Sequence, residues 1–170
     1  MHELSGELNI REQGAGSREQ RGFESARPLL DRLRAESPFA NDRAMLGRAR
    51  EILTELSEAD QIAVINAHPR IGERPELVQQ QSATSFTEQG YDRDTTPPEV
   101  LLRLASLNEE YEQKFGFRFV VFVNRRTKEA IVPVLEARLR GSRDEELRTA
   151  LGEILAIAED RLKTAGPGVR

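Results

Sequence analysis

The sequence predicts an all-α fold: a single-domain, multi-helix bundle with one short extended connector near residues 117–123. Three stretches carry apolar residues at helical spacing, and the connector is rich in aromatic and β-branched residues. The chain has 170 residues, which is enough for one domain with a hydrophobic core. Its content of Leu, Ile, Val and Phe argues against a disordered polymer.

The folded domain is expected to span residues 23–163. Residues 1–22 contain four glycines and few large apolar side chains, so they are expected to form a flexible N-terminal tail. Residues 164–170 contain two glycines and a proline, and they are expected to form a flexible C-terminal tail.

Three helices are predicted by their apolar stripes. The first stripe runs from Met45 to Leu56, the second from Val100 to Phe115 and the third from Leu147 to Leu162. Thr96 precedes two prolines and Glu99, a pattern typical of an N-cap followed by a proline in the first turn. The second helix is therefore expected to begin after Thr96.

A shorter helix is predicted between Ser57 and His68. Ser57 followed by Asp60 is typical of a helix N-cap. Pro69 disfavours helical geometry at the residue before it, so this helix is expected to end at His68.

The C-terminal half contains three less regular features. Residues 117–123 follow a glycine and lack a second strand to pair with, which predicts a lone buried connector. Pro133 leaves the helix that carries Leu135 either kinked or starting later than its pattern indicates. Residues 82–95 are polar and have no helical period, so we expect an irregular loop there.

Composition excludes several classes of function. The formal charge is −4, so no overall positive field favours nucleic acid. Cysteine is absent, which excludes disulfides and thiolate chemistry, and the chain has only two histidines, which excludes a histidine-rich metal site. No apolar stretch reaches membrane-spanning length and no signal peptide is evident, so we expect a cytoplasmic protein that does not bind membranes.

His68 is the one imidazole within the expected domain, since the other histidine is His2. A helix C-terminus favours the charged imidazolium, whereas burial lowers the pKa, and the sequence does not decide between these effects. The simplest interpretation of its position is a histidine that caps helix carbonyls.

The polar loop places a hydroxyl, a carboxylate and an amide close together, at Ser85, Glu88 and Gln89. Such a cluster can recognise a small polar ligand, and a carboxylate near an imidazole can support acid–base chemistry. An ordinary solvated loop has the same composition, so the sequence alone leaves both interpretations open.

Two arginines are predicted to point toward the protein interior. Counting about 100° per residue, Arg161 falls within the apolar arc of its helix, and Arg138 does the same on the preceding helix. A buried guanidinium without an anionic partner would be costly. Each arginine is therefore expected to extend to solvent at a helix end, to meet an internal carboxylate or, for Arg161 especially, to meet a small anionic ligand.

Several motifs occur together in a specific order. They are His68-Pro69, S-x-x-E-Q from Ser85, Y-E-Q-K-F-G-F-R-F from Tyr111, E-A-R-L from Glu136, and D-R-L from Asp160. In this order and spacing they resemble the 2-oxo-4-hydroxy-4-carboxy-5-ureidoimidazoline (OHCU) decarboxylases of urate breakdown. The resemblance extends from about residue 23 to residue 162.

The resemblance implies an all-helical enzyme that converts OHCU to (S)-allantoin without a metal or an organic cofactor. It implies that His68 is the acid–base residue and that Glu88 is its carboxylate partner. It also implies contacts from side chains to the ureido and ring groups, and from connector amides to the planar ring. The substrate-binding residues expected on this basis are Pro69, Ser85, Phe86, Gln89, Phe119, Val120, Val121, Phe122, Val123 and Arg161.

Three positions depart from the family pattern. Arg70 stands where an acidic residue is common, Arg118 stands where proline is frequent, and the loop has E-Q-G-Y in place of E-Q-A-G. The expected partner is a small anionic substrate, and the family also suggests a homodimer. The competing hypotheses are a non-enzymatic helical interaction module, which would scatter the candidate residues, and a hydrolase of a cyclic ureide.

Overall fold

The structure is a computed structural model that describes residues 17–93 and 95–164. Within these residues it contains nine helices and no β-strand, which confirms the predicted all-α class. The helices are α1 (Arg18–Phe23), α2 (Arg27–Glu36), α3 (Asp42–Glu55), α4 (Glu58–Asn66), α5 (Pro75–Gln81), α6 (Ala83–Glu88), α7 (Pro98–Phe115), α8 (Lys128–Arg138) and α9 (Arg143–Thr164).

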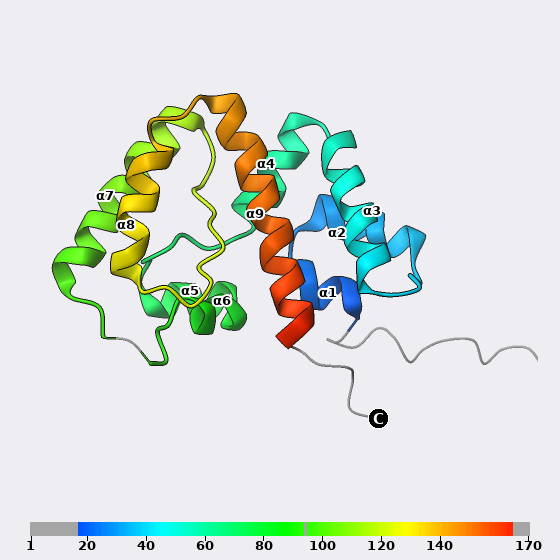
Figure 1. The fold of residues 1–170 in the computed structure, drawn as a ribbon, viewed down its shortest axis with the longest axis horizontal. Helices are drawn as coiled ribbons and strands as arrows, with labels where there is room; N and C mark the ends of the chain where they lie inside the picture. Colours follow the sequence, from blue (N-terminus) through cyan, green and yellow to red (C-terminus); the bar gives the residue numbers. More distant parts are fainter. Residues whose placement is uncertain (1–16, 94, 165–170) are drawn as a thin grey trace, which may run out of the picture.

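Helix α9 runs through the middle of the molecule, between α1–α4 on one side and α5–α8 on the other (Figure 1). It packs against α1, α3, α4 and α7. Its buried apolar face, which includes Ile154, Ala158 and Leu162, joins the main hydrophobic core. Because α9 contacts both halves, a polar side chain on its inner face can meet residues that are distant in the sequence.

The three apolar stripes lie in α3, α7 and α9, as predicted. Helix α7 begins one residue later than expected, because Pro97 is the N-cap and Pro98 is the first helical residue. A residue before proline is restricted to extended geometry, and Pro97 has ψ 139°. The prediction of Thr96 as the N-cap was therefore wrong.

The caps of α4 and α8 match the sequence pattern. The Ser57 hydroxyl accepts a hydrogen bond from the Asp60 amide at 3.2 Å, and α4 ends at Asn66, two residues before His68. The Thr127 hydroxyl accepts from the Ala130 amide at 3.2 Å, so α8 starts at Lys128 and continues past Pro133. The sequence left this helix either kinked at Pro133 or starting later than its pattern indicates, and the late start is therefore excluded.

Two segments that were expected to be irregular are helical. Residues 83–88 form α6, which Ser82 caps by accepting from the Ser85 amide at 2.9 Å. Six residues are too few to show an apolar period, which is why the pattern missed this helix. Residues 18–22, assigned to the N-terminal tail, lie in α1, where Gly22 and Phe23 are buried. Ser17 is the N-cap of α1, and Thr164, assigned to the C-terminal tail, is the last residue of α9. The other residues of the two predicted tails, 1–16 and 165–170, lie outside the described residues.

The connector at residues 117–123 is extended and mostly buried, as predicted. Its backbone polar groups bond to side chains in place of a second strand. The Val120 carbonyl accepts from Arg138 at 2.6 Å, and the Phe122 amide donates to Glu153 at 2.9 Å. Helices α8 and α9 thus hold the connector between them (Figure 1).

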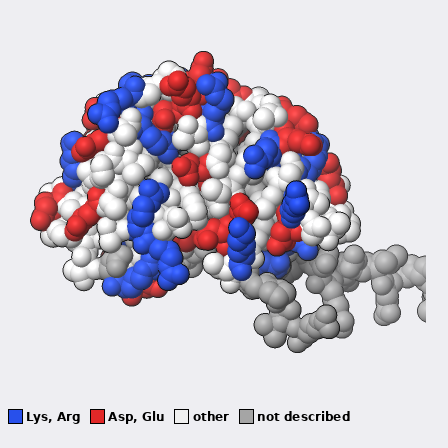
Figure 2. Space-filling model, viewed as in Figure 1, with Lys and Arg blue, Asp and Glu red and all other residues white. Residues whose placement is uncertain are grey.

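Acidic and basic side chains are interspersed over the face of the molecule shown in Figure 2. This mixture agrees with the small net charge of −4. Among residues 17–93 and 95–164, no helix is both long and apolar enough to cross a bilayer.

Candidate active site

His68 is held rigidly just beyond the end of α4. Its amide donates to the Ile65 carbonyl at 3.1 Å, and its Nδ1 lies 3.3 Å from the Val64 carbonyl. A carbonyl can only accept, so Nδ1 carries the proton and Nε2 is left with a free lone pair. His68 is therefore oriented as a base that accepts a proton at Nε2.

His68 is neutral near pH 7. Burial, followed by the positive charge of Arg161, lowers the pKa of His68 from 6.5 to about 4. The sequence left the balance between the helix terminus and burial open, and burial is the stronger effect here. The residue is only 8% exposed.

This low pKa predicts that the protein loses stability in mild acid. Between pH 6.5 and about 4 the unfolded chain binds a proton at His68 and the folded chain does not, so the free energy of unfolding falls as the pH falls. The loss should approach about 3 kcal/mol near the lower limit. Urea unfolding of the wild type and of His68→Asn across this pH range measures the contribution of His68. Carboxylates titrate in both proteins, so their contribution cancels in the difference between the two stability curves. Parallel stability curves for the two proteins would contradict the prediction.

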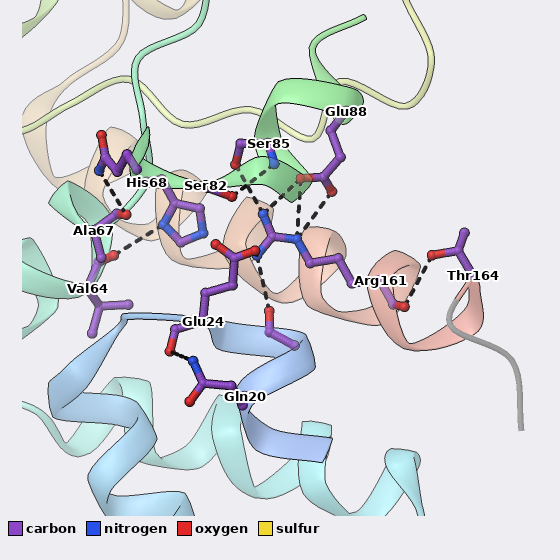
Figure 3. Close-up of polar contacts among 12 residues, drawn as sticks. Gln20, Glu24, Val64, Ala67, His68, Ser82, Ser85, Glu88, Arg161 and Thr164 are labelled. Atoms are coloured by element: carbon purple, nitrogen blue, oxygen red, sulfur yellow. Dashed lines mark hydrogen bonds and ion pairs between the residues drawn. The ribbon is translucent and has the colours of Figure 1, made fainter. Parts of the chain in front are cut away.

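Arg161 points inward from α9, as predicted, and its side chain is 5% exposed. It donates to both carboxylate oxygens of Glu88, with a shortest distance of 2.8 Å, and to the Ser85 hydroxyl at 3.3 Å (Figure 3). Ser85 and Glu88 lie three residues apart on α6 and therefore share a face. Arg161 thus ties α9 to α6.

Glu88 makes no hydrogen bond to His68 in the described part of the chain, although the resemblance implied that it is the carboxylate partner of His68. Within the described part of the chain, the hydrogen bonds of the Glu88 carboxylate go to Arg161, and none joins it to His68. The carboxylate whose negative charge raises the pKa of His68 belongs to Glu24, at the junction of α1 and α2. Sequence reasoning did not identify Glu24.

His68, Glu88 and Arg161 line one cavity of about 350 Å³. The connector forms another wall, and one end of α9 completes the site. Phe86 is the one predicted site residue outside the lining, because it follows Ser85 on α6 and stacks on Tyr91 instead. The predicted residues that line the cavity are His68, Pro69, Ser85, Glu88, Gln89, Phe119, Val120, Val121, Phe122, Val123 and Arg161.

Two of these predicted ligand contacts are already used within the protein. The Gln89 side chain accepts from the Gly72 amide at 2.9 Å and donates to the Arg70 carbonyl at 3.1 Å. It therefore braces the turn that follows His68. The Phe122 amide bonds to Glu153, so this connector amide is not available to a planar ring.

Comparison with known proteins identifies the family. Residues 17–163 match the family model described as OHCU decarboxylase. The chain belongs to the OHCU decarboxylase family.

Individual relatives agree with this assignment. The chain is 31% identical over 140 residues to the 2-oxo-4-hydroxy-4-carboxy-5-ureidoimidazoline decarboxylase of Haloferax volcanii, and the match covers 82% of each chain. It is 31% identical to the uric acid degradation bifunctional protein PucL of Bacillus subtilis, covering 82% of this chain and 28% of that one. A crystal structure of OHCU decarboxylase in the presence of (S)-allantoin has a TM-score of 0.71 and 25% identity, covering 88% of this chain and 97% of that one.

Arg70 and Arg118, at two positions that depart from the family pattern, both lie beside Glu112 on α7. Arg70 donates to both carboxylate oxygens of Glu112 at 3.0 Å, and Arg118 lies 3.9 Å from the same carboxylate. Arg118 also donates to the His68 carbonyl at 3.0 Å. Neither arginine lines the cavity. Arg118 holds the backbone at His68, whereas Arg70 pairs with the Glu112 carboxylate.

Several cavity residues were not found by sequence reasoning. Arg93 and Arg125 add positive charge to the lining, and Asp160 adds a carboxylate next to Arg161. Arg125 has a left-handed φ of 63°, which the sequence did not indicate because the residue is not glycine. Among the residues that the structure describes, no three His, Asp or Glu side chains are placed together as metal ligands.

Proposed function

We propose that the cavity beside His68 is the active site of an OHCU decarboxylase, with His68 as its acid–base residue. The chain is a carboxy-lyase of urate degradation that decarboxylates OHCU to allantoin. The observation that carries the site assignment is the meeting of three distant segments around one cavity. An interaction module would have no reason to gather an imidazole, a carboxylate and a guanidinium there.

The reaction needs few protein groups. Loss of carbon dioxide leaves an electron pair on the carbon that carried the carboxylate, and the adjacent carbon–nitrogen double bond of the substrate can accept it. The protein must orient the ring, so that the departing carboxylate lies out of the ring plane, and deliver a proton to one face. The apolar connector supports the first task, because its buried residues line one side of the cavity.

His68 supports the proton transfer. Its neutral imidazole, with Nε2 unprotonated, suits it to take the proton of the substrate hydroxyl and to return a proton during the reaction. Arg161 is the cation beside it, and its charge favours an anionic ligand even though Glu88 holds the guanidinium in place. Arg93 and Arg125 in the same lining add to this preference.

The direct test is the fate of freshly prepared OHCU. We expect the purified protein to release carbon dioxide from it faster than the spontaneous background. Ring opening without carbon dioxide would indicate a cyclic-ureide hydrolase, and no reaction above background would favour the interaction module. Either of these results would overturn the proposed function.

Two further features belong to this proposal. A cytoplasmic location remains a prediction, and so does a homodimer. Light scattering of the purified protein at catalytic concentrations tests the dimer, and a mass of 19.2 kDa, that of one chain, would exclude it.

A further inference from the structure

Glu24 has a constrained backbone at the junction of α1 and α2. Its φ of 44° and ψ of −107° lie in a region that residues other than glycine seldom adopt. The Gln20 side chain donates to the Glu24 carbonyl at 2.8 Å, and the Glu24 amide donates to the Gln20 carbonyl at 2.9 Å. These contacts hold Glu24 in a conformation that directs its side chain inward.

The Glu24 carboxylate is turned toward the imidazole of His68 and the guanidinium of Arg161 (Figure 3). Its Oε1 lies 3.8 Å from a terminal nitrogen of Arg161. Burial and Arg161 lower the pKa of His68, and the negative charge of Glu24 raises it. Glu24 therefore favours the protonated form of His68.

Glu24 also faces a second cavity, of about 650 Å³. This cavity shares Thr84, Arg161 and Thr164 with the active-site cavity. Glu24 lines the second cavity but not the active-site cavity. The Glu24 side chain is 27% exposed, and His68 is 8% exposed. Glu24 thus connects solvent on one side with the buried imidazole on the other.

Decarboxylation consumes a proton in every turnover. The carbon–carbon bond to the carboxylate breaks, carbon dioxide leaves, and the electron pair shifts into the adjacent carbon–nitrogen double bond. The carbon that carried the carboxylate and the hydroxyl becomes a carbonyl. Two protons complete the product, one on the ring nitrogen and one on the neighbouring carbon, and the substrate hydroxyl supplies one of them. The balance is one carboxylate anion and one proton giving one neutral product and carbon dioxide. His68 can pass on the proton that it takes from the substrate hydroxyl, but the second proton must reach it from solvent, and a ligand in the first cavity blocks the direct route.

We propose that Glu24 resupplies His68 with this proton, taking it from solvent in the second cavity and passing it to the imidazole. Within the described residues no hydrogen bond joins the two side chains, so the transfer runs through an intervening water molecule. The proposal rests on the proposed decarboxylase function and makes Glu24 a positioning residue that acts through His68. A carboxyl group can lose and regain a proton within each turnover, whereas the neighbouring guanidinium stays protonated. The charged or titratable groups that face Glu24 are His68, which follows α4, and Arg161 on α9. Arg161 also pairs with Glu88 on α6, and Arg21 lines the second cavity with Glu24.

The test uses Glu24→Gln, which keeps the size of the side chain and removes its ability to carry a proton. We expect kcat near neutral pH to fall by about tenfold or more, with little change in KM. Added formate, acetate or imidazole should restore kcat in proportion to the concentration of the acid form. The exposed Glu129→Gln on α8 is the matched control and should show neither the loss nor the rescue.

The assay should follow circular dichroism of the allantoin formed, because spontaneous decay yields a racemate and does not contribute to this signal. Unchanged kcat in Glu24→Gln at every pH would overturn the proposal. So would a loss that small acids do not restore, since that result indicates a structural role. Wild-type protein in the same assay separates the two claims, because failure of the wild type refutes the decarboxylase function itself.

A second readout does not depend on activity. In Glu24→Gln the pKa of His68, followed by NMR of its imidazole, should be lower than in the wild type, because a negative charge that favours the imidazolium is gone. His2→Gln removes the one other histidine and leaves a single signal to follow. An unchanged pKa would show that Glu24 does not act on His68.

Discussion

His68→Asn is expected to lower kcat for OHCU decarboxylation by about 10²- to 10⁴-fold, the usual contribution of positioned acid–base catalysis. Asparagine can keep a hydrogen bond to the Val64 carbonyl, but it cannot exchange a proton near neutral pH. His68→Ala should lose at least as much activity. The measurement is the steady-state rate of carbon dioxide release, corrected for spontaneous decay.

Protein stability must be followed in the same variants. Near pH 7 His68→Asn replaces one neutral side chain by a smaller one that can keep the hydrogen bond to the Val64 carbonyl, so the loss in the free energy of unfolding should be no more than about 1 kcal/mol. His2→Ala is the matched control, because it removes the other imidazole of the chain and should keep wild-type activity. A folded His68 variant that decarboxylates OHCU at the wild-type rate would show that His68 is not the acid–base residue.

Arg138→Ala is expected to destabilise the fold by about 3–5 kcal/mol, as removal of one partner from a buried ion pair commonly does. Arg138 donates to Glu146 at 2.7 Å, and the two side chains are 11% and 6% exposed. Without Arg138, the buried carboxylate of Glu146 keeps its hydrogen bond from the Tyr111 hydroxyl at 2.8 Å but has no ion-pair partner among the described residues. Urea unfolding at pH 7 measures the loss.

Two control variants isolate the cause. The double variant Arg138→Met, Glu146→Gln removes both charges and should recover most of the lost stability. Arg103→Ala breaks an exposed pair with Glu136 and should change the free energy of unfolding by less than about 1 kcal/mol. If Arg138→Ala were no more destabilising than Arg103→Ala, the buried network would not stabilise the fold as described.

The Arg138 network also reaches the active site. Its guanidinium lies 4.6 Å from the centroid of the Phe119 ring and donates to the Val120 carbonyl, so it fixes the connector that lines the cavity. A partly folded Arg138 variant should therefore lose activity together with stability. His68→Asn, in contrast, should lose activity and keep most of its stability at pH 7.

Periodicity predicted the parts of the fold that depend on long amphipathic helices. The stripes of α3, α7 and α9 are recognisable because each spans several turns, and the same helical geometry correctly predicted that Arg161 points inward. Helix α6 was missed because six residues do not establish a period. The polar cluster at Ser85 and Glu88 was found as a composition, but its shared helical face was not.

The candidate site was predicted less completely, for reasons that lie in tertiary structure. Nothing local pairs Glu88 with Arg161 in preference to His68, since α9 must first be placed against α6. Glu24 escaped notice because its inward direction depends on a positive φ at a residue that is not glycine. The low pKa of His68 likewise depends on burial, which position along the chain could not establish.

The most direct test of the account is the handedness of the allantoin formed from fresh OHCU. A stopped assay by circular dichroism should show a single enantiomer, (S)-allantoin, from the wild-type protein, and racemate at the background rate from His68→Asn. Racemic product from the wild type, or a single enantiomer formed at an undiminished rate by the His68 variant, would contradict the assignment of this cavity as the decarboxylase active site.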